Sequence, residues 1–179
     1  MPNKFTYQVV KDTTEHAVIK ITGSFDGSTN EDNAHRIQAN TLYGALDANN
    51  VPLKTHLSLS NTAKPYYGLT VNRVWYDTWP YEGDVELYWY SDDPQTILLM
   101  NGNGEYDGNG NWVTIPNPNT AIANTNGDIG IRSRLAPNCN TSSYTIIMEL
   151  RKLNEYYQRG QFNDPAAFNY PPYGLTGTK

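Results

Sequence analysis

The chain has 179 residues and a formal net charge of −5 at pH 7. This length allows one domain with a sizeable core, and the acidic balance argues against a nucleic-acid-binding protein, which normally has a basic face. Only 17% of the residues are charged, below the roughly 25% of an average soluble domain. Asn, Thr, Gly and Tyr take their place, and such a surface favours contact with proteins or sugars.

Cysteine usage and hydropathy exclude several further classes. The single Cys139 cannot form an internal disulfide or a cysteine-based zinc site. The N-terminus lacks the apolar core of a signal peptide, and no stretch is long enough to span a membrane. We therefore expect a chain that is made in a cytoplasm, without a signal peptide and without a membrane partner.

Short runs of alternating apolar and polar residues predict strands along most of the chain. In the run 69–76, the side chains of Leu69, Val71, Arg73 and Trp75 are expected on one face. Residues 33–46 fit neither period and are predicted as a strand plus a loop. The other predicted strands are 5–11, 17–22, 55–59, 85–90, 96–100, 112–115, 128–132 and 144–151.

The turns between these runs are rich in Gly, Pro, Asn and Asp, and no helical period is clear. Eight to ten short strands joined in this way predict an all-β fold, namely a single-domain antiparallel β-sandwich. Either a jelly-roll-like or an immunoglobulin-like sandwich is compatible with the pattern. The predicted body covers residues 1–153, and an extended C-terminal arm covers residues 154–179.

The C-terminal arm combines aromatic residues and prolines without a helical or strand period. Soluble monomers rarely expose so many apolar rings, and a disordered tail is normally poor in aromatics. The arm is therefore expected to lie against its own body or against a neighbouring protein. Its candidate contact residues are Tyr156, Tyr157, Phe162, Phe168, Tyr170 and Tyr173.

The Asn-Gly-rich loop at residues 101–111 invites a calcium interpretation. Asp107, Asn109 and Asn111 occupy positions one, three and five of an EF-hand-like loop. However, Trp112 replaces the required glycine and Pro118 replaces the bidentate acid. Asn-Gly and Asp-Gly pairs are also strong turn formers, so a hairpin or surface loop is favoured and no metal is expected.

No other set of residues predicts catalysis or a cofactor. His16, His35 and His56 form no zinc pattern, and Cys139 has no base placed beside it by sequence. Glu105 and Asp107 lie on one loop, where solvated acids are commoner than a glycosidase pair. We therefore expect a protein that is not an enzyme.

Aromatic residues gather in the middle of the chain. Trp75 and Trp89 are expected to fill the sandwich core, because both lie on strongly predicted strands. Trp79 and Tyr81 flank Pro80 in a predicted turn. For these two residues, an exposed contact with a partner or a glycan fits the pattern as well as a purely structural role does.

Three phrases of the chain resemble a family of virion structural proteins. They are residues 65–76, 102–112 and 157–170, and the likeness extends over most of residues 5–173. This family occurs in tailed bacteriophages, notably marine phages that infect cyanobacteria. The resemblance implies a component of the virion and supplies no catalytic residues.

The expected function is thus a non-enzymatic virion protein, with a capsid decoration (cement) role favoured. Its partners would be the major capsid protein or other virion proteins, and a homo-oligomer, with a trimer as one option, would suit a local symmetry axis. The alternatives are a neck, tail or tail-fibre component, a carbohydrate-binding module and, last, a glycan hydrolase. Deleting residues 154–179 is expected to leave a folded domain that no longer binds particles.

Overall fold

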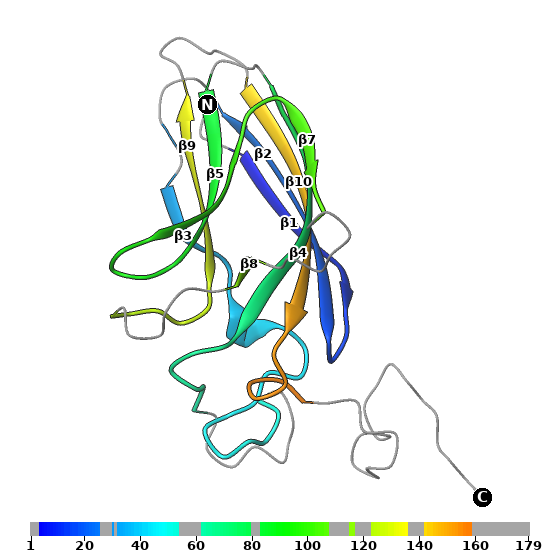
Figure 1. Cartoon of the computed structure of the whole chain (residues 1–179), viewed down its shortest axis with the longest axis vertical. Coiled ribbons are helices and arrows are strands. Elements are labelled where there is room, and N and C mark those ends of the chain that lie inside the picture. Colours follow the sequence, from blue (N-terminus) through cyan, green and yellow to red (C-terminus); the bar gives the residue numbers. More distant parts are fainter. Residues whose placement is uncertain are drawn as a thin grey trace, which may run out of the picture.

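Two antiparallel sheets face each other in the computed structural model of the chain (Figure 1). The structure describes residues 4–25, 30, 32–53, 62–79, 83–107, 115–116, 123–135 and 142–158. The expected all-β sandwich is confirmed.

The larger sheet has the strand order β1-β2-β10-β4-β7, with β8 beside β4, and the smaller sheet has the order β3-β9-β5-β6. A short 3-10 turn, η1 (Ala39–Thr41), follows β3. The strands are β1 (Lys4–Asp12), β2 (His16–Phe25), β3 (Asp32–Ile37), β4 (Leu69–Trp79), β5 (Gly83–Trp89), β6 (Gln95–Met100), β7 (Asn103–Tyr106), β8 (Ile115–Pro116), β9 (Ile129–Leu135) and β10 (Ser142–Lys152).

The pairing of the strands is that of a jelly roll. β2 pairs with β10, β3 with β9, β4 with β7 and β5 with β6, and all four pairs are antiparallel. The two sheets thus hold the strands β2-β10-β4-β7 and β3-β9-β5-β6, which is a double Greek key rather than the immunoglobulin order. β1 extends the larger sheet beyond β2.

The core lies between the two sheets. On β10, the side chains of Ile146, Met148 and Leu150 are fully buried, while the alternate residues face outward. Trp89 on β5 enters the same core from the smaller sheet and is 1% exposed. The prediction that Trp89 fills the core is confirmed.

A β-bulge in β4 changes which side chains of that strand face the core. Val71 pairs with Leu150 and Arg73 pairs with Glu149, so Asn72 is an extra residue on β4. Before the bulge, Val71 faces inward; after it, Val74 does, and both are fully buried. The prediction of one continuous face through Arg73 and Trp75 is therefore wrong.

Three tyrosines each lie across a glycine of the neighbouring strand. The cross-strand pairs are Tyr144 with Gly23, Tyr76 with Gly104 and Tyr88 with Gly130. A methyl group on any of these glycines would come within 2.4 Å of its tyrosine ring or hydroxyl. These pairs use the space of a missing side chain to hold an aromatic ring flat on the sheet.

The pairing of Tyr76 with Gly104 also explains why the sequence predicts a loop where the structure has a strand. Residues 101–111 are predicted as a loop, whereas 103–106 form β7, which pairs with β4 at the edge of the larger sheet. Glycine in a strand interior is a weak strand former, but here it makes room for Tyr76. The predicted strands at 55–59 and 112–114 lie outside the described residues.

Candidate functional site on the outer face of the larger sheet

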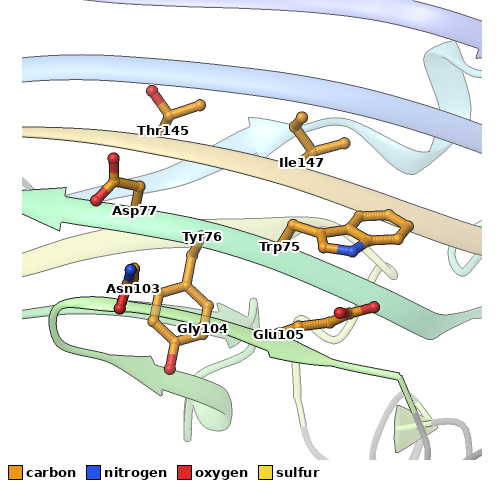
Figure 2. Close-up of a pocket in the computed structure, with 8 residues that line it drawn as sticks. All are labelled: Trp75, Tyr76, Asp77, Asn103, Gly104, Glu105, Thr145 and Ile147. Atoms are coloured by element: carbon orange, nitrogen blue, oxygen red, sulfur yellow. The ribbon is translucent and has the colours of Figure 1, made fainter.

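A shallow depression lies on the face of the larger sheet that points away from the core (Figure 2). Its volume is about 540 Å³, which falls in the range of small-molecule sites. Tyr76 and Gly104 also line it, and we call it the Trp75 depression. The side chains that line it belong to Trp75, Asp77, Asn103, Glu105, Thr145 and Ile147.

Strand register arranges these side chains in two rows across three strands. Trp75 on β4 pairs with Ile147 on β10 and with Glu105 on β7. One step along, Asp77 pairs with Thr145 and with Asn103. Side chains two residues apart on a strand lie about 7 Å apart on the same face. The row of Trp75, Ile147 and Glu105 therefore runs beside a polar row of Asp77, Thr145 and Asn103.

Trp75 is the residue whose position differs most from expectation. The sequence predicts Trp75 in the core beside Trp89, but it is half-buried and lines the outer depression. The bulge at Asn72 is the cause, because it moves Trp75 to the opposite face from the buried Val71. Figure 2 shows the indole lying beside Ile147.

The polar groups of the depression are available for contact. Asp77, Asn103 and Glu105 are exposed. Within the described part of the chain, their side chains take part in no hydrogen bond or ion pair. The lining includes two carboxylates and no cationic side chain.

Trp79 lies on the same face of β4, two residues beyond Asp77. It is 57% exposed and lies about 13 Å from Trp75 by strand spacing. Tyr81, its predicted companion, lies outside the described residues.

The outer face of the smaller sheet carries a different set of charges, which satisfy one another. Glu86 on β5 accepts hydrogen bonds from Arg132 Nε at 2.6 Å and Nη2 at 2.8 Å, and from Thr96 Oγ1 at 2.6 Å. Its side chain is only 3% exposed. The hydrogen bonds from Arg132 lower the pKa of Glu86, whereas burial opposes this shift.

Tyr88 continues this network on the smaller sheet. Its hydroxyl donates a hydrogen bond to Asp32 Oδ1 at 3.0 Å, and the Arg132 guanidinium lies 4.9 Å from its ring centre. Burial of the ring, followed by the bond to Asp32, raises the pKa of Tyr88 to about 12. A face whose charges are already paired has fewer groups to offer a ligand, so it is the weaker candidate site.

The first residues of the predicted arm belong to the domain. Tyr157 is 1% exposed, and its hydroxyl donates a hydrogen bond to the Ala39 carbonyl at 2.9 Å. The Leu46 amide donates to the Tyr156 carbonyl at 2.9 Å, and the Gln158 amide donates to the Gly44 carbonyl at 2.7 Å. Burial raises the pKa of Tyr157 well above its ordinary value.

Lys152 fixes the same end of the sandwich. Its side chain is fully buried, and its ammonium group bonds to Asp12 and donates to the Thr13 and Tyr43 carbonyls at 2.6 and 2.7 Å. The ammonium also lies 5.2 Å from the ring centre of Tyr157. The end of β10 is thus tied to the start of the C-terminal segment by charge and by packing.

These contacts change the interpretation of the C-terminal residues. Tyr157 offers no surface to a partner, because it is buried among Ala39, Tyr67 and Lys152. Tyr156 is half-buried, with its ring 5.1 Å from Tyr66. The remaining predicted contact residues, Phe162, Phe168, Tyr170 and Tyr173, lie outside the described residues.

The part of the chain that the structure describes holds neither a cluster of metal-ligating side chains nor a membrane-spanning helix. There, no group of three or more His, Cys, Asp or Glu residues is placed to hold a metal ion. His16 lies 3.5 Å from Glu149, whereas Cys139 and His56 fall outside the described ranges. Among the described residues, no helix has the length and apolar character needed to cross a membrane.

The sequence matches no protein-family model, no curated protein and no solved structure. Any function must therefore be argued from the residues and geometry of this chain.

Proposed function

We propose that the chain is a non-enzymatic structural protein of a bacteriophage virion, which decorates the assembled capsid and stabilises it. Two general features support this proposal. One is the resemblance of residues 65–76, 102–112 and 157–170 to phage virion proteins. The other is the jelly-roll topology, which recurs among viral capsid domains. Because one fold serves many functions, this analogy supports a class of protein rather than a particular partner.

The observation that carries the proposal is the attachment of the C-terminal segment to the body. Tyr157 and Gln158 are held against Ala39 and Gly44, so the chain beyond residue 158 starts from a fixed point. This point lies at the end of the sandwich where β4 begins and β10 ends (Figure 1).

The residues that follow this point have the composition of a contact segment. Four aromatic side chains follow, and aromatics are enriched at protein interfaces. Twenty-one residues, when extended, reach up to about 70 Å, enough to pass from one subunit to the next. Starting from an anchored point also reduces the entropy lost when such a segment binds. In this proposal, residues 159–179 bind the surface of the major capsid protein.

A truncation series tests this function. The chain ending at Gln158 keeps the buried Tyr157 and should remain folded, as judged by circular dichroism. The full-length chain should co-sediment with capsids that lack it, and the chain ending at Gln158 should bind at least ten times more weakly. Retained binding by this truncation would show that residues 159–179 do not make the contact.

The location in the particle is tested separately. Cryo-electron microscopy of intact particles should show regular copies of the domain over the head. Density only at the neck or tail would instead support a connector or tail-fibre role. If the chain were missing from purified particles, as measured by mass spectrometry, the virion proposal would be overturned.

A further inference from the structure

We propose that the Trp75 depression binds a neutral oligosaccharide, with a sugar ring stacked on the indole of Trp75. This inference does not depend on a virion role, because it rests on the outer face of the larger sheet alone. It extends the sequence-based expectation of a glycan contact at Trp79 to a different set of residues.

The division of the depression into two halves matches the chemistry of a sugar. Trp75 and Ile147 provide a flat apolar surface, and Asp77, Thr145 and Asn103 lie beside it (Figure 2). A pyranose ring presents C–H groups on its faces and hydroxyl groups around its edge. A ring stacked on Trp75 would therefore direct hydroxyl groups towards the polar row, about 7 Å along the strands.

The hydrogen-bonding groups of the depression are mainly acceptors. The carboxylates of Asp77 and Glu105 accept hydrogen bonds, and the amide of Asn103 both donates and accepts. Because these side chains have no partner within the described residues, they keep their capacity for a ligand. Sugar hydroxyl groups are the donors that such acceptors require.

Charge defines the class of sugar. Two carboxylates and no cationic side chain line the depression, and the chain carries a net charge of −5. Sulfated, phosphorylated or carboxylated sugars would be repelled at this site. The geometry therefore points to uncharged glycans.

The position of Trp79 indicates a chain of sugars rather than a single one. It lies on the same face of β4 as Trp75, about 13 Å away, and is 57% exposed. Two indoles at this spacing, with Asp77 between them, suit a ligand longer than one ring.

A protein partner fits the same surface less well. Charged residues are depleted from the centre of protein–protein interfaces, whereas Asp77 and Glu105 flank Trp75 directly. The strands also hold the site rigid, since each lining side chain comes from a paired position of β4, β7 or β10.

The test is calorimetric titration of the full-length chain with neutral hexasaccharides of glucose, mannose, galactose and N-acetylglucosamine. At least one should bind, and Trp75→Ala should weaken that binding at least tenfold. Asp77→Asn and Glu105→Gln, which change exposed side chains, should each weaken it several-fold. Leu99→Ala, at a half-exposed position on β6 of the smaller sheet, is the matched control and should bind as the unchanged chain does.

Each contrary outcome is decisive. If no neutral hexasaccharide binds, or if all three site variants bind normally while folded, the proposal is overturned. Preferential binding of heparin, a sulfated glycan, would overturn the inference of a neutral ligand. If no sugar binds and the folded Trp75→Ala chain loses attachment to capsids, the depression is a protein-docking surface instead.

Discussion

Gly127 occupies a turn in which neither the backbone nor the available space tolerates a side chain. Its φ is +92°, and a methyl group at this position would lie 2.0 Å from the Tyr67 carbonyl oxygen. The Tyr67 amide donates to the Asn126 carbonyl at 3.0 Å, and the next residue, Asp128, accepts the Ala39 amide at 2.8 Å. A change at Gly127 therefore disturbs several segments at once.

We expect Gly127→Ala to lower the free energy of unfolding by more than the cost of positive φ alone, which is about 1–2 kcal/mol. Gly44→Ala is the matched control, since φ is +76° there but the nearest atoms are 3.5 Å away. Urea denaturation should show about 1 kcal/mol of destabilisation for Gly44→Ala and a clearly larger loss for Gly127→Ala. Equal losses would mean that the turn shifts to accept the methyl group.

At the scale of elements, the two sheets use their outer faces differently. The smaller sheet buries Glu86 beneath Arg132, Thr96 and Arg134, so its charges stabilise the pairing of β5 with β9 and β6. The larger sheet leaves Asp77 and Glu105 exposed around Trp75. One face thus contributes to stability, while the other remains available for a ligand.

The charge of Glu86 should make stability depend on pH. Because its folded pKa lies below the ordinary value of 4.5, its stabilising contribution is present above about pH 4.5 and is lost as the pH falls through the folded pKa. Glu86→Gln should cost about 1.5–3 kcal/mol at pH 7 and less at pH 3.

Urea denaturation at pH 7 and pH 3 checks this expectation. The exposed Glu105→Gln should change the free energy of unfolding by less than about 0.5 kcal/mol at both values. A cost for Glu86→Gln that does not shrink at pH 3 would contradict the ionic role of Glu86.

In the domain as a whole, the segment that follows β10 packs against residues 39–46. β10 ends at Lys152, yet the chain remains attached as far as Gln158, with the isolated bridge of Ala45 to Tyr157 beside the Tyr157 hydroxyl bond to Ala39. The contact joins residues more than 100 positions apart and completes the core at this end. Residue 158, rather than residue 153, is therefore the suitable place for a truncation.

We expect the chain truncated after Leu153 to be less stable than the chain truncated after Gln158 by about 3–5 kcal/mol, the usual loss for a large buried aromatic side chain. Tyr157→Ala in the full-length chain should reproduce most of that difference. Guanidinium denaturation of the two truncations, of Tyr157→Ala and of the unchanged full-length chain measures both differences. If both truncations unfold at the same concentration, Tyr157 does not stabilise the domain as its burial indicates.

The fold class could be predicted from the sequence, because alternating runs such as 144–151 and the turn residues between them are local signals. For Trp79 the sequence left an exposed and a structural role equally open, and the structure places it, 57% exposed, on β4 rather than in the predicted turn. The strand patterns around Trp75 and Trp89 predict the core for both, which is right for Trp89 and wrong for Trp75.

The face of Trp75, the strand at 103–106 and the burial of Tyr157 could not be predicted, because they depend on long-range contacts. Each involves a partner that is distant in the sequence. The bulge at Asn72 lies in the pairing of β4 with β10, Tyr76 fills the space over Gly104, and the Ala39 carbonyl accepts a hydrogen bond from the Tyr157 hydroxyl. The Trp75 depression could not be predicted for the same reason, because its residues come from three strands whose register is fixed by pairing. Local periodicity carries no information about pairing across the sheets, and this pairing places the candidate site.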